Sequence, residues 1–100
     1  PEYHTFYHAP AVIVISAKEE KFTAFDCGAA AENIALAAYG KNIGSCIIGS
    51  AEFMFSENPE MHTVLKIPEN YHFVCAISLG YFEKTTAVSE RNEDVIDYIA

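Results

Sequence analysis

The sequence predicts a single domain of the α/β or α+β class, in which a small sheet is covered by helices. Three short apolar runs, rich in β-branched residues, alternate with segments of helical composition along the 100 residues. Hydrophobic types make up 51% and charged types 20%, which excludes a disordered chain. A domain of this length buries roughly two-thirds of its unfolded surface, so we expect one core.

The first strand is predicted at residues 11–16, which read Ala-Val-Ile-Val-Ile-Ser. The apolar run is continuous rather than alternating, and this favours a strand that is covered on both faces. Pro10 cannot donate a ladder hydrogen bond, so it suits the entry of the strand. The charged residues 18–21 then predict a solvated turn.

A long helix is predicted over residues 24–41, where alanine is the commonest residue. Thr23 and Asp26 have the spacing of a capping box, and Phe22 is placed to pack on Cys27 as a hydrophobic staple. Apolar residues occur nearly all round this helix. The sequence therefore predicts a central helix that is buried on every side.

The end of this helix is predicted at Gly40 or Gly44, since glycine takes the left-handed conformation of a helix exit at little cost. Lys41 lies where a positive charge complements the helix dipole. A short strand follows at residues 45–48 and is bracketed by Gly44 and Gly49.

Two short helices and a last strand complete the predicted order. Ser50 can cap the first of these helices, and Asn58 followed by proline starts the second at roughly residues 59–66. Residues 71–79 predict another buried strand. Three strands make a thin sheet, which indicates strands supplied by another segment or by a partner.

The charge balance excludes several function classes. There are 14 acidic and 6 basic side chains, a net charge of −8, which argues against nucleic acid or an anionic membrane as the main partner. No apolar run reaches the roughly 18 residues of a membrane span, and no export leader opens the chain. We therefore expect a soluble protein.

The three cysteines, Cys27, Cys46 and Cys75, predict neither a disulfide framework nor a zinc ribbon. Their number is odd and they form no C-x-x-C pair. Each lies in an apolar stretch, which is typical of a buried, free thiol. A reducing, cytoplasmic compartment is expected on this basis.

The four histidines, His4, His8, His62 and His72, lack the ligand spacings that zinc requires. His4 and His8 are four residues apart, but Pro10 and the β-branched run make a helix there unfavourable. We expect no metal site, and solvated or loop-packed histidines instead.

Two features are candidates for ligand binding. Residues 44–49 read Gly-Ser-Cys-Ile-Ile-Gly, which has the wrong spacing for a nucleotide-phosphate loop; its glycines nevertheless leave backbone open to a flat ligand. Arg91 is the only arginine, and the arginine fork suits phosphate. The alternatives are a short core strand and a surface ion pair of Arg91 with neighbouring carboxylates such as Glu90.

Taken in order, several segments resemble the nitroreductase family of flavoproteins. They are the Ala-Pro-plus-strand segment at residues 6–15, the Asp-Cys-Gly-Ala-Ala-Ala-Glu-Asn run at 26–33, and the Ile-Gly-Ser-Cys-Ile-Ile-Gly run at 43–49. Leu-Lys-Ile-Pro at 65–68 and Ile-Ser-Leu-Gly-Tyr at 77–81 follow. The resemblance covers about residues 6–98 and rests on the ordered series rather than on any one motif.

The resemblance implies an α+β fold with a central mixed sheet covered by helices, and a homodimer with FMN at the subunit interface. It also implies NAD(P)H-dependent, ping-pong hydride transfer to a nitroaromatic, a quinone or a similar acceptor. Arg91 would bind the FMN phosphate, and the segment after Gly80 would be an arm that embraces the partner subunit. The residues whose backbone would pack against the isoalloxazine ring are Cys46, Ile47, Ile48 and Gly49. No side chain is identified as a catalytic acid or base.

The chain departs from the family in its N-terminal part. Family members usually carry a preceding region with an Arg-Ser-x-Arg type motif for the FMN phosphate, whereas residues 1–10 contain no cation besides histidine. We therefore expect residues 1–100 to be one domain and the C-terminal part of a longer flavoprotein. The alternatives are a site completed by another polypeptide, a cofactor-free dimerisation or interaction domain, and a small thiol-redox protein using Cys46. The apolar neighbours Ile47 and Ile48 argue against the last.

Overall fold

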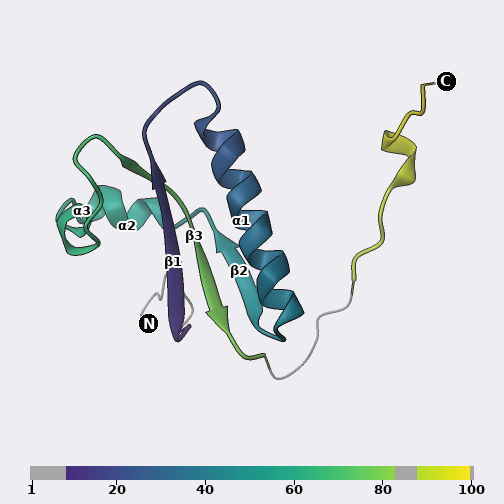
Figure 1. The fold of residues 1–100 in the computed structure, drawn as a ribbon, viewed down its shortest axis with the longest axis horizontal. Helices are drawn as coiled ribbons and strands as arrows, with labels where there is room; N and C mark the ends of the chain where they lie inside the picture. Colours follow the sequence, from purple (N-terminus) through teal and green to yellow (C-terminus); the bar gives the residue numbers. More distant parts are fainter. Residues whose placement is uncertain (1–8, 83–87, 100) are drawn as a thin grey trace.

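The computed structural model describes residues 9–82 and 88–99 and has the element order that the sequence predicts (Figure 1). The α+β class is confirmed. The elements are β1 (Ala11–Ala17), α1 (Thr23–Gly40), β2 (Gly44–Ile48), α2 (Glu52–Glu57), α3 (Met61–Val64), β3 (His72–Gly80) and the 3-10 turn η1 (Glu93–Val95).

The sheet has the order β1-β3-β2, so the last strand in the sequence lies at its centre. Both pairings are antiparallel, and the described residues therefore show no parallel pair of the expected mixed sheet. Ile77 is the centre of the ladder, because it lies opposite Ile13 of β1 and Ile47 of β2 and is 0% exposed. β1 is an edge strand, and Ile13 is 38% exposed, so the expected covering of this strand on both faces is incomplete.

A β-bulge in β3 decides which side chains reach the core. Val74 has no partner on β1, because the register shifts by one residue at this point. One extra residue reverses the alternation of side chains, so Phe73 points to the same face as Ala76. The Phe73 ring stacks there on Phe55 of α2, with 4.5 Å between the ring centroids. The aromatic core depends on this irregularity.

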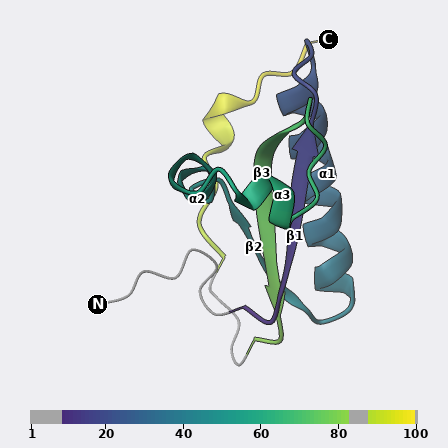
Figure 2. The same cartoon turned by 90° about the vertical axis from the view of Figure 1, so that its left-hand side faces the viewer.

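Helices lie on both faces of the sheet, α1 on one and α2 with α3 on the other (Figure 2). Small residues of α1, among them Ala31 and Ala38, are buried against the sheet, and their size allows the helix backbone to approach it closely. The core on the opposite face is built from Ile48, Ala51, Phe55, Phe73 and Ala76.

The prediction that α1 is buried on every side is wrong for this chain. Phe25, Leu36 and Tyr39 are 78%, 60% and 75% exposed, and they lie on the side of the helix that faces away from the sheet. The described residues contain no element that covers this outer face. The helix α1 therefore has more apolar surface than the described part of the chain covers.

The start of α1 also differs from the prediction. The Thr23 hydroxyl donates to the backbone carbonyl of Lys18 at 2.6 Å and accepts from the N–H of Glu20 at 2.8 Å. It fixes the preceding turn instead of forming a capping box with Asp26, and the N-cap residue Phe22 makes no side-chain cap. Phe22 is largely exposed rather than packed as a staple.

The predicted glycine exit from α1 is wrong as well. Asn42 takes the left-handed conformation, with φ of 60°, and no glycine among the described residues has a positive φ. Asparagine tolerates this region better than other non-glycine residues. The two short helices begin after Ala51 and Glu60, without the side-chain caps expected from Ser50 and Asn58.

The C-terminal segment at residues 88–99 extends away from the sheet on the side of α1 and β2 (Figure 1). Its apolar side chains are exposed, including Val95, Tyr98 and Ile99. Residues 83–87, where the expected arm begins, lie outside the described part of the chain. No described helix is long and apolar enough to span a membrane.

Candidate functional site

The site residues predicted from the sequence fall into two groups, and the first is on β2. Ile48 is buried in the core and anchors the strand, whereas Cys46 and Ile47 are exposed. Ile47 lies opposite Ile77 and shares its face, so it points to the side of α1. Because β2 pairs only with β3 among the described residues, its outer edge is open.

Gly49 ends this strand with an open backbone. A Cβ atom added at Gly49 would meet nothing within 4 Å, and the residue has no positive φ. Neither packing nor conformation within the described chain requires glycine there. The observation fits a position where a ligand approaches the backbone closely.

A pair of glycines shapes the other end of β2. Gly44 and Gly80 lie directly opposite each other in the ladder. A Cβ atom at Gly44 would lie 3.0 Å from Cδ1 of Phe82, and one at Gly80 would lie 3.0 Å from Cδ of Pro10. A side chain at either position would crowd the ring that packs onto it. The sequence showed the glycines, but only the fold shows that they face each other.

Beside this glycine pair is an open hollow of about 630 Å³ on the surface. Cys46 and Ser78 face it from neighbouring strands, since they are cross-strand partners. The sequence analysis missed Ser78, because a serine within an apolar strand gives no signal of what lies opposite it. The complete lining is Ala9, Pro10, Gly44, Ser45, Cys46, Ser78, Leu79, Gly80, Tyr81 and Phe82.

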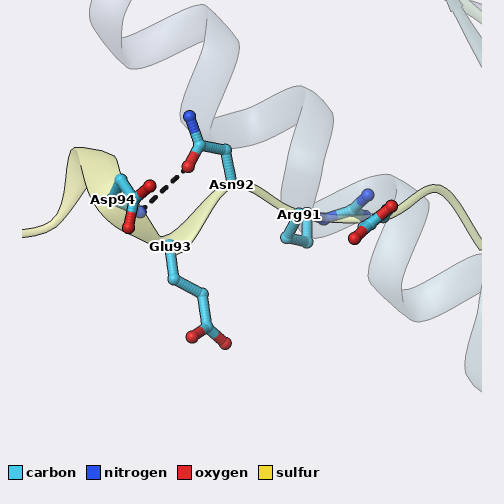
Figure 3. Close-up of a pocket in the computed structure, with 5 residues that line it drawn as sticks. Arg91, Asn92, Glu93 and Asp94 are labelled. Atoms are coloured by element: carbon cyan, nitrogen blue, oxygen red, sulfur yellow. Dashed lines mark hydrogen bonds between the residues drawn. The ribbon is translucent and has the colours of Figure 1, made fainter.

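Arg91 forms the second group, on the C-terminal segment (Figure 3). One guanidinium nitrogen donates to the Ser89 carbonyl at 2.8 Å, which leaves its other N–H groups available. The side chain of Asn92 accepts from the N–H of Asp94 at 3.0 Å and caps the 3-10 turn. A hollow of about 790 Å³ is lined by Glu90 through Asp94, so three carboxylates share this hollow with the arginine.

The described chain does not bring these two groups together. The hollow at Arg91 is lined by residues 90–94 alone, and the hollow at Cys46 contains no residue of the C-terminal segment. A ligand that touched both β2 and Arg91 of one chain would require a different placement of this segment. Alternatively, the two groups belong to sites shared with another chain.

The histidines have structural partners. His72 Nε2 lies 3.3 Å from a carboxylate oxygen of Glu19, and the ring of His62 packs edge-on against Phe55 with centroids 5.2 Å apart. Within residues 9–82 and 88–99 no three potential ligands cluster to hold a metal. His4 and His8 lie outside the described residues.

The cysteines differ in their surroundings. Cys27 is buried on α1, and Cys75 is half-buried on β3. Burial, together with the nearby Cys27 thiol, raises the pKa of Cys75 and keeps it protonated. Cys46 is exposed, so the expectation that every thiol is buried is wrong at this position.

Comparison with known proteins identifies the family. Residues 2–81 match the Nitroreductase family, and the chain belongs to it. A nitroreductase with bound FMN from Desulfitobacterium hafniense DCB-2 is 30% identical, with a TM-score of 0.84 over 96% of this chain and 54% of that one. A nitroreductase with bound FMN from Bacteroides fragilis NCTC 9343 is 28% identical, with a TM-score of 0.86 over 99% of this chain and 56% of that one.

A third solved structure carries a nicotinamide-dependent assignment. It is provisionally assigned as an NADH dehydrogenase/NAD(P)H nitroreductase from Bacteroides thetaiotaomicron VPI-5482, and it is 26% identical, with a TM-score of 0.73 over 90% of this chain and 55% of that one. The chain thus spans about half the length of these solved chains. None of the curated proteins compared with the chain matches it.

Proposed function

We propose that this chain is the C-terminal part of an FMN-dependent NAD(P)H oxidoreductase that reduces a nitroaromatic, a quinone or a similar acceptor in the cytoplasm. Membership of the Nitroreductase family and the FMN bound to two similar proteins support the proposal. The observation that carries it is the open edge of β2, where Cys46 and Ile47 are exposed and Gly49 leaves the backbone uncovered.

The residues of β2 fit the ring of a flavin. An edge strand presents unpaired N–H and C=O groups, which are the partners that the polar edge of an isoalloxazine needs. Ile48 fixes the strand in the core, so these groups are held in place before a ligand binds. FMN, when bound, supplies the hydride chemistry, and the protein's part is binding and orientation.

The phosphate side of the site is less complete in this chain. Arg91 has free donors for a phosphate, but Glu90, Glu93 and Asp94 line the same hollow and the chain carries a net charge of −8. A phosphate dianion in these surroundings needs further cations. We infer that residues outside this chain, in the same polypeptide or in a partner subunit, complete the phosphate site.

A homodimer accounts for the exposed apolar surface. The outer face of α1 and the C-terminal segment both present large apolar side chains to water, for example Leu36 and Tyr98. Surfaces of this kind mark sites of protein association. In the proposed assembly, the C-terminal arm of one subunit packs on its partner and places Arg91 at a shared flavin site.

The described site contains no side chain placed as a catalytic acid or base. The side chains with polar atoms that line the hollow beside β2 are those of Ser45, Cys46, Ser78 and Tyr81, and this lining contains no carboxylate, histidine or cation. Water or the acceptor substrate therefore supplies the protons of the proposed reduction.

Flavin titrations of the native protein test the proposal. Gly49→Val should weaken FMN and riboflavin equally, by about tenfold or more, because a side chain at this open position blocks the ring. Arg91→Ala should weaken FMN alone by about tenfold, since riboflavin has no phosphate for the guanidinium to bind. Gly28→Ala is the matched control, because its Cβ would also meet nothing within 4 Å and it lies away from β2.

The titrations also separate the proposal from its alternative. If Gly49→Val leaves both affinities unchanged, β2 is not the flavin-contacting strand. If the native protein binds neither flavin, it is a cofactor-free association domain. Unchanged selectivity between FMN and riboflavin in Arg91→Ala removes Arg91 from the phosphate site.

A further inference from the structure

Cys46 is exposed, whereas Cys75 is half-buried and Cys27 is buried. The Cys46 sulfur has a single polar contact within the described residues, a distant one of 3.9 Å to the Ile47 carbonyl. Cys27 is buried, and burial of Cys75 raises the pKa of its thiol, which disfavours the nucleophilic thiolate. A thiol reagent should therefore react at Cys46, and Cys27 and Cys75 serve as internal controls for its selectivity.

Beside Cys46 lies a hydroxyl, that of Ser78, which makes no side-chain hydrogen bond to another described residue. Ser78 is directly opposite Cys46 in the β2–β3 ladder, on the same face, and it is 7% exposed. No fully enclosed side-chain oxygen in that part of the chain is left unpaired, so the Ser78 hydroxyl reaches the hollow.

A hydroxyl that opens onto the hollow can donate to or accept from a polar group of a ligand that lies close to the Cys46 sulfur. The hollow, of about 630 Å³, has the size of a small-molecule site. It is lined by uncharged side chains only, while the chain as a whole carries a charge of −8.

We propose that Cys46 is a site of reversible S-thiolation by small disulfides, and that the Ser78 hydroxyl binds a polar group of the attached thiol. The Cys46 thiolate attacks one sulfur of the disulfide and forms a new S–S bond as the original one breaks. The released thiolate takes a proton from water. Cys46 is oxidised, one half of the disulfide is reduced, and excess thiol reverses the step.

Charge limits the class of disulfide that this site takes. The negative charge of the chain repels an anionic disulfide, and the hollow offers no cation that would bind one. Neutral disulfides with a hydroxyl or amide group fit best, because such groups can pair with Ser78. Bis(2-hydroxyethyl) disulfide is therefore the probe.

The site itself does not depend on the proposed flavin chemistry, but its consequence does. A group attached at Cys46 covers the exposed part of β2, so the adduct and FMN should exclude each other. Thiolation would then couple flavin loading to the thiol–disulfide balance of the cell.

The experiment incubates the native protein with the probe and measures intact mass and adduct position. One adduct is expected, on Cys46, and dithiothreitol should remove it. Cys46→Ser should gain none, whereas Cys75→Ser should react like the wild type. Ser78→Ala should lower the equilibrium amount of adduct by about three- to tenfold, the value of one hydrogen bond. Ser45→Ala, also in the lining but exposed, is the matched control and should have no effect.

Diethyl disulfide, which is the probe without its two hydroxyl groups, gives the same test without a mutation. The wild type should prefer the hydroxylated probe by a similar factor. Equal reaction with both probes, or an adduct on Cys27 or Cys75 of the folded protein, overturns the proposal. If FMN fails to bind while Cys46 is still thiolated with the expected preference, only the proposed flavin function fails.

Discussion

The two sides of α1 have opposite surroundings although both are apolar. The inner side presents small residues to the sheet, and Cys27, Ala31 and Ala38 are buried there. The outer side presents Phe25 and Leu36 to solvent. The inner side of α1 therefore packs on the sheet of the same chain, whereas no described element of the chain covers its outer side.

This difference explains why an apolar sequence does not by itself predict burial. The pattern of α1 indicates a helix enclosed on all sides, and the described chain supplies only the sheet. The chain spans about half the length of the solved nitroreductases that it resembles. The outer side of α1 is therefore where we expect further polypeptide, from the same chain or from a partner subunit.

The largest difference in the free energy of unfolding should appear between truncation of Ile77, in the sheet beneath α1, and truncation of Leu36, on the outer side of α1. Ile77→Ala removes a side chain that is 0% exposed beneath α1, and it should lower the free energy of unfolding by about 2–5 kcal/mol. Leu36→Ala should change it by less than about 0.5 kcal/mol in the isolated chain. Urea denaturation of both variants measures the difference, and equal effects would contradict the two-sided account.

Replacing an alanine by leucine on each side of α1 should give a smaller difference in the free energy of unfolding. Ala31 is buried against the sheet, so Ala31→Leu should lower the free energy of unfolding by about 1–3 kcal/mol through overpacking. Ala29 is exposed, and Ala29→Leu should leave stability nearly unchanged. The same denaturation experiment decides, and a stable Ala31→Leu protein would show that the inner interface has unused space.

Self-association sharpens the comparison from the outer side. Leu36→Asp places a charge on the proposed dimer surface, so it should weaken dimerisation about tenfold or more while the fold stays intact. Glu32→Gln, on the same side of the helix, is a control that removes rather than adds charge. Sedimentation equilibrium measures the association, and unchanged dimerisation of Leu36→Asp would place the interface elsewhere.

The smallest expected effect is the pH dependence that Cys75 contributes. Its pKa is raised above the ordinary value of 9.0, so the folded state holds this proton more tightly than the unfolded state. The stabilisation is fully present below that pH and is lost as the pH rises toward the folded-state pKa. Thermal melts at alkaline pH should show a shallower decline of stability for Cys75→Ala than for the wild type, and equal declines would contradict this account.

The element order followed from the sequence because strands and helices here have distinct residue types. The limits of β1, α1, β2 and β3 each lie within one residue of the predicted ones. Helix capping was harder to predict, because the Thr23 hydroxyl could bond either to the helix or to the preceding turn. In the structure it donates to the Lys18 carbonyl and stabilises the turn. The bulge at Val74 left no trace in the apolar pattern.

The candidate site was predictable only in part. The residues on β2 were singled out because glycines bracket a short strand. Cys46, Ile47 and Gly49 are exposed, whereas Ile48 is buried in the core. Arg91 was singled out by residue type, but type says nothing about position, and its segment does not share a hollow with β2. Ser78 was missed, because its importance arises from the cross-strand register.

The central claim is that the native protein carries FMN on a site to which β2 contributes. The most direct measurement is the visible absorption spectrum of the purified native protein, together with its intact mass. We predict a flavin spectrum and a mass well above the 11.0 kDa of this chain. A colourless protein that also takes up no added FMN would contradict the claim and assign the chain to a cofactor-free association domain.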